Sequence, residues 1–149
     1  MIHALIDTDI LIDGCFNRQP FADDSIQILK LCEVGEICGF TTPLLLSNFY
    51  YLLRKINPHQ QTIAIVSKIT QILTIMPVTA ESVLQAIESP FKDFEDALQY
   101  QSCLEQGNIQ LIVTRNKKDY QNSAIAVMTP TELLAHLAQN SPNHPIAGR

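Results

Sequence analysis

Short apolar runs alternate along this chain with longer segments of helical character, and this alternation constrains the fold more than any other feature. The runs cover residues 2–6, 36–40, 72–77, 110–114 and 125–128. They are largely continuous in apolar residues rather than apolar at every second position, which is typical of parallel strands buried on both faces. The sequence therefore predicts an α/β fold in three α/β/α layers, with a short, mostly parallel five-stranded sheet in the middle.

The segments between the runs carry start signals for helices. Thr42 is a favoured N-cap residue and is followed by Pro43, which suits the first helical turn. Thr129 and Glu132 have the spacing of a capping box. We expect helices at residues 8–13, 23–34, 42–55, 58–71, 79–88, 93–106 and 129–139.

Length and composition fit a single domain. The chain has 149 residues, of which 46% are hydrophobic, so one sizeable core can be buried. We expect residues 1–139 to form this domain and residues 140–149, which contain two prolines and no apolar period, to be a loose tail. No apolar run approaches the roughly 18–20 residues of a membrane span, and the start does not read as a signal peptide. We therefore expect a cytoplasmic protein with no membrane partner.

Polar side chains follow two of the predicted strands at the points where these strands end. Asp7 follows the first strand, and Asn116 and Asp119 follow the fourth. Ligands of parallel sheets bind outside the carboxyl ends of the strands, so these residues are expected at one edge. Asp7 fits either a cation ligand or the cap of the next helix, whereas Asp9 is expected to cap or to hydrogen-bond a neighbouring loop.

Two predicted helices bring further oxygen atoms to the same edge. Asp93 and Asp96 are three residues apart and share one face of a first turn, where their charges repel each other. Acidic residues are also common in first turns because of the helix dipole, and Glu95 shows the same bias. Asn48, in the middle of a helix, fits a pocket ligand and a core hydrogen bond equally well. Together these carboxylates and amides predict a site for a hard divalent cation.

The net charge of −5 excludes nucleic-acid binding through the overall field of the protein. A local basic rim made of Arg115, Lys117 and Lys118, with the hydroxyl of Thr114, would bring RNA to the pocket. Each of these cations also fits an ordinary solvated surface charge. The chain has no glycine-rich phosphate loop of the GxGxxG or GxxxxGKS type.

Four phrases of the chain resemble the PIN-domain family, and in particular the VapC-type toxin ribonucleases. They are LIDTDILID, SNFYYLLRK, DFEDALQ and VTRNKKDY, and the resemblance runs from Met1 to about Leu137. It implies a three-layer α/β/α fold that cleaves RNA with Mg²⁺ or Mn²⁺ held by about four acidic residues. It also implies a small antitoxin protein, whose tail blocks the pocket, and a homodimer.

The resemblance places the acidic positions of the family at Asp7, Asn48, Asp96 and Asn116, so two of the four are amides here. Asp93 and Asp119 are nearby carboxylates that can compensate. We therefore expect catalytic residues at Asp7, Asn48, Asp93, Asp96, Asn116 and Asp119, metal ligands at the four aspartates among them, and substrate-binding residues at Thr114, Arg115, Lys117 and Lys118. The resemblance favours a metal-dependent endoribonuclease, and a catalytically weakened module that binds RNA or protein is the alternative.

Overall fold

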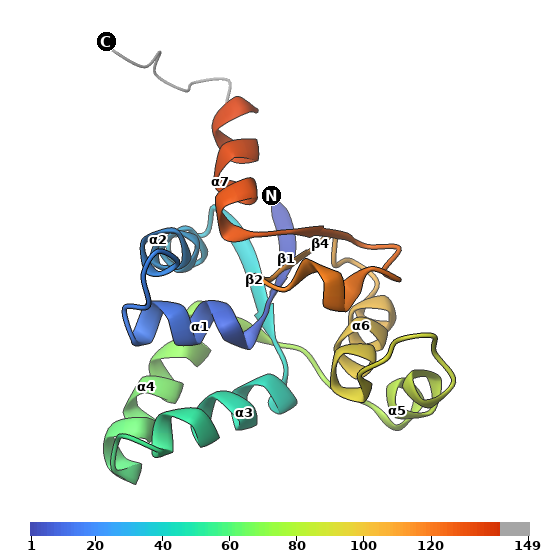
Figure 1. Cartoon of the computed structure of the whole chain (residues 1–149), viewed down its shortest axis with the longest axis horizontal. Coiled ribbons are helices and arrows are strands. Elements are labelled where there is room, and N and C mark those ends of the chain that lie inside the picture. Colours follow the sequence, from blue (N-terminus) through green and yellow to red (C-terminus); the bar gives the residue numbers. More distant parts are fainter. Residues whose placement is uncertain (141–149) are drawn as a thin grey trace.

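The computed structural model describes residues 1–140 and contains a parallel sheet between two layers of helices (Figure 1). The strands are β1 (Ile2–Ile6), β2 (Ile37–Thr41), β3 (Thr74–Ile75), β4 (Leu111–Val113) and β5 (Ala126–Met128). They are ordered β3-β2-β1-β4-β5, and every neighbouring pair is parallel. The predicted α/β class and five-stranded sheet are confirmed. The tail expected at residues 140–149 falls outside the described residues, apart from Asn140.

The helices begin and end close to the expected residues. They are α1 (Thr8–Cys15), α2 (Ala22–Glu33), α3 (Pro43–Arg54), α4 (His59–Ile72), α5 (Ala80–Ile87), α6 (Phe94–Gln106) and α7 (Pro130–Gln139). A 3₁₀ turn, η1 (Lys117–Tyr120), follows β4 and was not predicted. No helix within residues 1–140 has both the length and the apolar character needed to cross a membrane.

The predicted start signals work as N-caps. The hydroxyl oxygen of Thr42 accepts a hydrogen bond from the backbone N–H of Leu45 at 3.1 Å. The side chain of Thr129 accepts from the backbone of Glu132, whose carboxylate accepts in return from the backbone of Thr129. Each cap satisfies donors that the helix itself leaves unpaired.

The central strand β1 is buried on both faces, which explains its continuous apolar sequence. Ala4, Leu5 and Ile6 are each 0% exposed. Ala4 and Ile6 pack into a core with residues of α1, α2, α3, α4 and α7, whereas Leu5 packs on the other face with Tyr100 of α6 and Tyr120 of η1. Figure 1 shows these two groups of helices on opposite sides of the sheet. The three-layer arrangement is therefore confirmed.

The third strand is shorter than the expected run over residues 72–77. Helix α4 extends to Ile72, and β3 pairs only with the end of β2. Leu73 and Met76 on either side of β3 are buried, and Pro77 has no N–H to extend the pairing. The apolar run thus supplies core residues for the helix end and the loop as well as for the strand.

Gly39 in β2 provides the first stability prediction. A Cβ atom at this position would lie 2.6 Å from Cδ2 of Leu73 and 2.7 Å from Sγ of Cys32, both of which are packed in the core. We expect Gly39→Ala to lower the free energy of unfolding by about 1–3 kcal/mol, because the site is overpacked. Urea denaturation measures this change.

Gly14 in α1 is the matched control for this substitution. A Cβ atom there would lie 3.5 Å from Leu29 and 3.6 Å from Ile26, which is ordinary contact. Because alanine favours a helix by about 1 kcal/mol over glycine, Gly14→Ala is expected to leave stability unchanged or to raise it. Equal effects at the two glycines would contradict the packing described for β2.

Candidate active site

Asp7 lies where β1 ends and α1 begins, at the carboxyl edge of the sheet. Its backbone N–H donates to the carbonyl of Val113 at 3.0 Å, which continues the pairing of β1 with β4. One carboxylate oxygen accepts from the N–H of Thr8 at 2.8 Å, and the other from the hydroxyl of Thr114 at 2.8 Å. Asp7 is thus the N-cap of α1 and also lines a pocket. Burial raises its pKa above the ordinary value of 3.8, more than these hydrogen bonds lower it.

Asp9 ties the loop after β4 to the first turn of α1. Its Oδ2 accepts from the backbone N–H of Arg115 at 3.0 Å and from the amide of Asn116 at 3.2 Å, and lies 3.2 Å from the hydroxyl of Thr114. The expectation that Asp9 bonds a neighbouring loop is confirmed. Its Oδ1 is buried and has no hydrogen-bond partner within the described residues. Burial, with the charge of Asp7 second, raises the pKa of Asp9 to about 7.

Asp13 and Arg115 form an ion pair one turn further along α1. Asp13 is 0% exposed, and its oxygens accept from Nε of Arg115 at 2.5 Å and from the terminal nitrogen at 3.1 Å. The guanidinium also lies over the ring of Phe21, 4.1 Å from its centroid. This pair was not predicted from the sequence. The bidentate contact holds Arg115, which was expected to bind substrate, against α1.

The other predicted basic residues lie in η1. Lys117 forms an ion pair with Glu132 of α7 at 3.1 Å, and both side chains are about half exposed. Lys118 is exposed in the same turn. None of the three cations lines the pocket that contains Asp7. Their role in binding substrate stays a prediction.

The start of α6 carries the second group of acids. Asp93 is the exposed N-cap, and its side chain accepts from the N–H of Asp96 at 2.9 Å. Asp96 is half-buried, and its pKa is raised to about 7, with burial as the largest cause. The charges of Asp93, Asp7, Asp119 and Glu95 contribute to this rise, in that order. The first turn of α6 and the end of β1 therefore share one electrostatic environment, as the sequence predicted.

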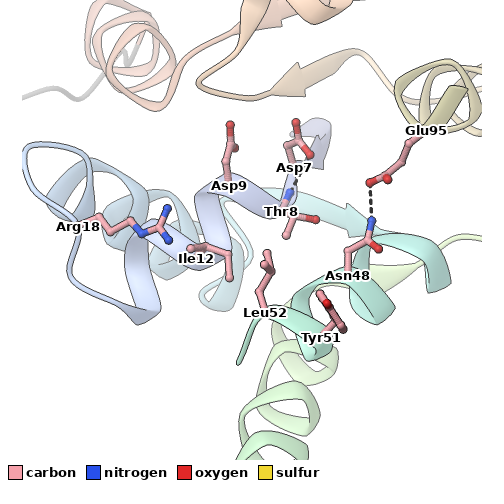
Figure 2. Close-up of a pocket in the computed structure, with 9 residues that line it drawn as sticks. All are labelled: Asp7, Thr8, Asp9, Ile12, Arg18, Asn48, Tyr51, Leu52 and Glu95. Carbon is pink, nitrogen blue, oxygen red and sulfur yellow. Dashed lines mark hydrogen bonds between the residues drawn. The ribbon is translucent and has the colours of Figure 1, made fainter. Parts of the chain in front are cut away.

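Asn48 of α3 faces this acidic group from the opposite side. Its amide donates to the carboxylate of Glu95, as Figure 2 shows. The sequence left open whether Asn48 bonds within the core or enters the pocket, and the side chain lies in the pocket. The pocket has a volume of about 420 Å³ and is lined by Asp7, Thr8, Asp9, Ile12, Arg18, Asn48, Tyr51, Leu52 and Glu95.

Asn116 and Asp119 lie on the β4 side of the site. Asn116 contacts Asp9, as described above, and the backbone N–H of Asp119 donates to the carbonyl of Asn116 at 3.0 Å. The negative charge of Asp119 raises the pKa values of both Asp7 and Asp96. Neither Asn116 nor Asp119 lines the pocket itself. Both belong to the turn that follows β4.

The donor set fits a hard divalent cation. Such cations prefer carboxylate and amide oxygens, and a cation would offset the repulsion that raises these pKa values. Asp9 Oδ1 and the hydroxyl of Tyr120, which is 2% exposed, are both buried without a partner within residues 1–140. In that part of the chain no three acidic, histidine or cysteine side chains already converge as a ligand group. A cation such as Mg²⁺, which keeps several waters and takes one or two carboxylates, suits such a site.

Four charged or aromatic residues of the pocket were not among the predicted site residues. Glu95 was taken only as a first-turn acid, although it lies beside Asp96 in the same turn. Asp9 was expected mainly to cap or to bond a loop. Arg18 and Tyr51 carry no local signal, because only the fold brings the segment after α1 and the middle of α3 to the same pocket.

The ion pair of Asp13 and Arg115 yields a stability prediction. Asp13→Asn removes one partner of a buried charge pair, and we expect the free energy of unfolding to fall by about 2 kcal/mol. Lys117→Met is the matched control, because it breaks an exposed pair and is expected to cost less than about 1 kcal/mol. Chemical denaturation of both variants tests this contrast, and similar losses would contradict the dominant role of the buried pair.

The raised pKa of Asp96 predicts a pH-dependent stability. Between pH 3.8 and about 7 the folded chain holds a proton on Asp96 that the unfolded chain has released. Stability contributed by this group therefore falls as the pH rises through that range. In a metal chelator, Asp96→Asn is expected to match the wild type near pH 4 and to exceed its stability above pH 7. Urea denaturation across this pH range measures the difference, and a constant difference would refute the assignment.

Comparisons with known proteins identify the family and the fold. Residues 3–118, most of the chain, match the family described as PIN domain. The chain is 28% identical over 134 residues to Ribonuclease VapC1 of Aquifex aeolicus (strain VF5), with 87% of this chain and 91% of that protein covered.

Two solved structures share the fold. One is VapBC2 from Rickettsia felis bound to a DNA fragment from its promoter, with a TM-score of 0.65, 15% identity and coverage of 86% of this chain and 98% of that chain. The other is a toxin-antitoxin complex from Klebsiella pneumoniae, with a TM-score of 0.64, 22% identity and coverage of 85% and 97%. Since the family match spans β1, β4 and the acidic residues between them, the chain belongs to the PIN-domain family.

Proposed function

We propose that this protein is a metal-dependent endoribonuclease of the PIN-domain type and acts in the cytoplasm as the toxin of a toxin–antitoxin pair. The observation that carries the proposal is the shared electrostatic environment of Asp7, Asp9 and Asp96, whose pKa values are all raised. Raised carboxylate pKa values at one sheet edge are characteristic of functional sites. The name of the relative, Ribonuclease VapC1, supports RNA as the substrate class.

Mg²⁺ or Mn²⁺ would be held by Asp7 and Asp96, with Asp93, Asp119 or Glu95 completing the acidic set. Such an ion supplies an acidified water and stabilises charge on a phosphodiester during hydrolysis. The chain's own residues orient this set: Thr114 donates to the ligand Asp7, and Asn116 donates to Asp9, which lies beside it in the pocket. No side-chain nucleophile is required for this chemistry.

Glu95 supplies the charge that is absent at Asn48. A carboxylate at position 48 would face Glu95 and repel it, whereas the amide donates a hydrogen bond to it. The pocket thus keeps one negative charge at this place, carried by α6 instead of α3. Because the charge is retained, the amide at Asn48 is compatible with an active nuclease.

A small antitoxin protein and a second copy of the chain are the proposed partners. The toxin–antitoxin complex from Klebsiella pneumoniae shares the fold of this chain and supports the antitoxin. Dimerisation follows only from the family resemblance. Sedimentation of the purified chain, alone and co-expressed with the product of an adjacent reading frame, tests both.

A binding module with little catalytic activity is the second candidate function. The amides at Asn48 and Asn116 favour it, because they lower the negative charge available to a cation. Calorimetric titration with Mn²⁺ separates the two candidates, since a binding module of this kind would show no divalent site.

The central prediction concerns Asp96. Purified protein is expected to cleave RNA only with Mg²⁺ or Mn²⁺, and Asp96→Asn is expected to abolish cleavage and to weaken Mn²⁺ binding, because it removes a ligand charge. Gel electrophoresis of RNA products and calorimetry are the measurements. Glu36→Gln is the control, because Glu36 is exposed and precedes β2, at the opposite edge of the sheet.

Two results would contradict the nuclease assignment. One is a folded wild type that cleaves no RNA with either cation. The other is an Asp96→Asn variant that cleaves as fast as Glu36→Gln.

A further inference from the structure

The pocket is acidic, whereas RNA is an anion, so a cation must hold the strand beside it. Two of the basic residues predicted from the sequence are already engaged. Arg115 is bound by Asp13, and Lys117 is bound by Glu132. Lys118, like Arg115 and Lys117, does not line the pocket, so a different cation at the pocket wall is needed.

Arg18 meets this need. It lies between α1 and α2, lines the pocket, and extends its guanidinium toward α1 (Figure 2). Its backbone is well fixed, since its N–H donates to the carbonyl of Asp13 at 3.0 Å and its carbonyl accepts from Phe21 at 2.9 Å and Ala22 at 2.7 Å. Its guanidinium has no acidic partner within residues 1–140 and lies 5.7 Å from the centroid of the Phe16 ring.

Tyr51 supplies an aromatic surface to the same pocket. It is 64% exposed and follows Asn48 by three residues on α3, so the two side chains share one helical face. The ammonium group of Lys55 lies 5.1 Å from the centroid of its ring. An exposed aromatic ring next to a cation is an arrangement that binds single-stranded nucleic acid, because a base stacks on the ring while the cation attracts the backbone.

We propose that Arg18 and Tyr51 are the substrate-binding residues of this pocket, and that they bind a single-stranded RNA segment next to the phosphate that is cleaved. Arg18 binds a backbone phosphate, and Tyr51 stacks on an adjacent base. This inference rests on the proposed ribonuclease function, and it assigns the phosphate contact to Arg18 in place of Arg115.

RNA explains this surface better than a protein partner does. A wall of Asp7, Asp9 and Glu95 beside one unpaired arginine suits a ligand that brings its own negative charge and can share a bound cation with the carboxylates. The large exposed face of Tyr51 suits a planar base. An acidic peptide would satisfy Arg18 but would gain nothing from a flat aromatic ring.

Binding of a fluorescent single-stranded RNA to the full chain, measured by anisotropy with Ca²⁺ in place of Mg²⁺, tests the inference. We expect Arg18→Gln to reduce the slope of log affinity against log salt by about 0.7, the value for one phosphate contact on a single strand. We expect Tyr51→Ala to weaken binding about five-fold to a hundred-fold without changing that slope. Arg18→Lys and Tyr51→Phe are expected to keep most of the binding.

Two substitutions on α4 are matched controls. Lys68→Gln removes an exposed cation and Ile63→Ala an exposed apolar side chain, and neither residue lines the pocket. Both are expected to bind RNA like the wild type. In cleavage assays with Mg²⁺, the Arg18 and Tyr51 variants are expected to raise KM more than they lower kcat.

The outcomes separate this inference from the proposed function. If the wild type cleaves RNA but Arg18→Gln and Tyr51→Ala bind it like the controls, the inference is wrong and the nuclease assignment stands. The inference is also wrong, and the nuclease assignment stands, if these variants bind RNA normally and fail only to bind a protein partner. If the wild type neither binds nor cleaves RNA, both the inference and the nuclease assignment fail.

Discussion

The parallel pairing of β1 with β4 is the constraint on which the candidate site depends. Ile6 pairs with Val113, and the next hydrogen bond, from Asp7 to Val113, carries that pairing into the loop. Asp7 and Thr114 therefore leave the sheet side by side, and the hydroxyl of Thr114 reaches the carboxylate at 2.8 Å. A shift in this register would turn the side chain of Thr114 away from Asp7.

The loop after β4 is held by contacts with α1 rather than by its own sequence. Asp9 and Asp13 are four residues apart on one face of the helix, and they bind respectively the backbone and the guanidinium of Arg115. One helix face thus determines where Thr114 and Asn116 lie. This arrangement gives the short helix α1 two functions, since it lines the pocket and also positions the loop after β4.

The fold and the site could be predicted from the sequence to different depths. Apolar runs and N-caps are local signals, so nearly every helix and strand was expected, although the order of the strands was not. The length of β3 was overestimated because its apolar run is shared with α4. Asp7 and Asp96 were predicted as site residues because each follows a local signal and matches a family motif. The contacts of Arg115 with Asp13 and of Asn48 with Glu95 join residues 102 and 47 positions apart, and no local pattern encodes such partners.

The structure separates the charges that hold the site together from those left for a ligand. Arg115 and Lys117 are neutralised by acids of α1 and α7, so their positive charges serve the fold. Within residues 1–140 the carboxylates of Asp7, Asp9 and Asp96 form no ion pair, and burial first, then the charges of neighbouring acids, raises their pKa values. Such a cluster destabilises the folded chain, and a protein retains it where a bound cation relieves the repulsion and the site has a function. Under the proposed function, the attraction of RNA is local to the pocket, so the negative net charge of the protein does not prevent it.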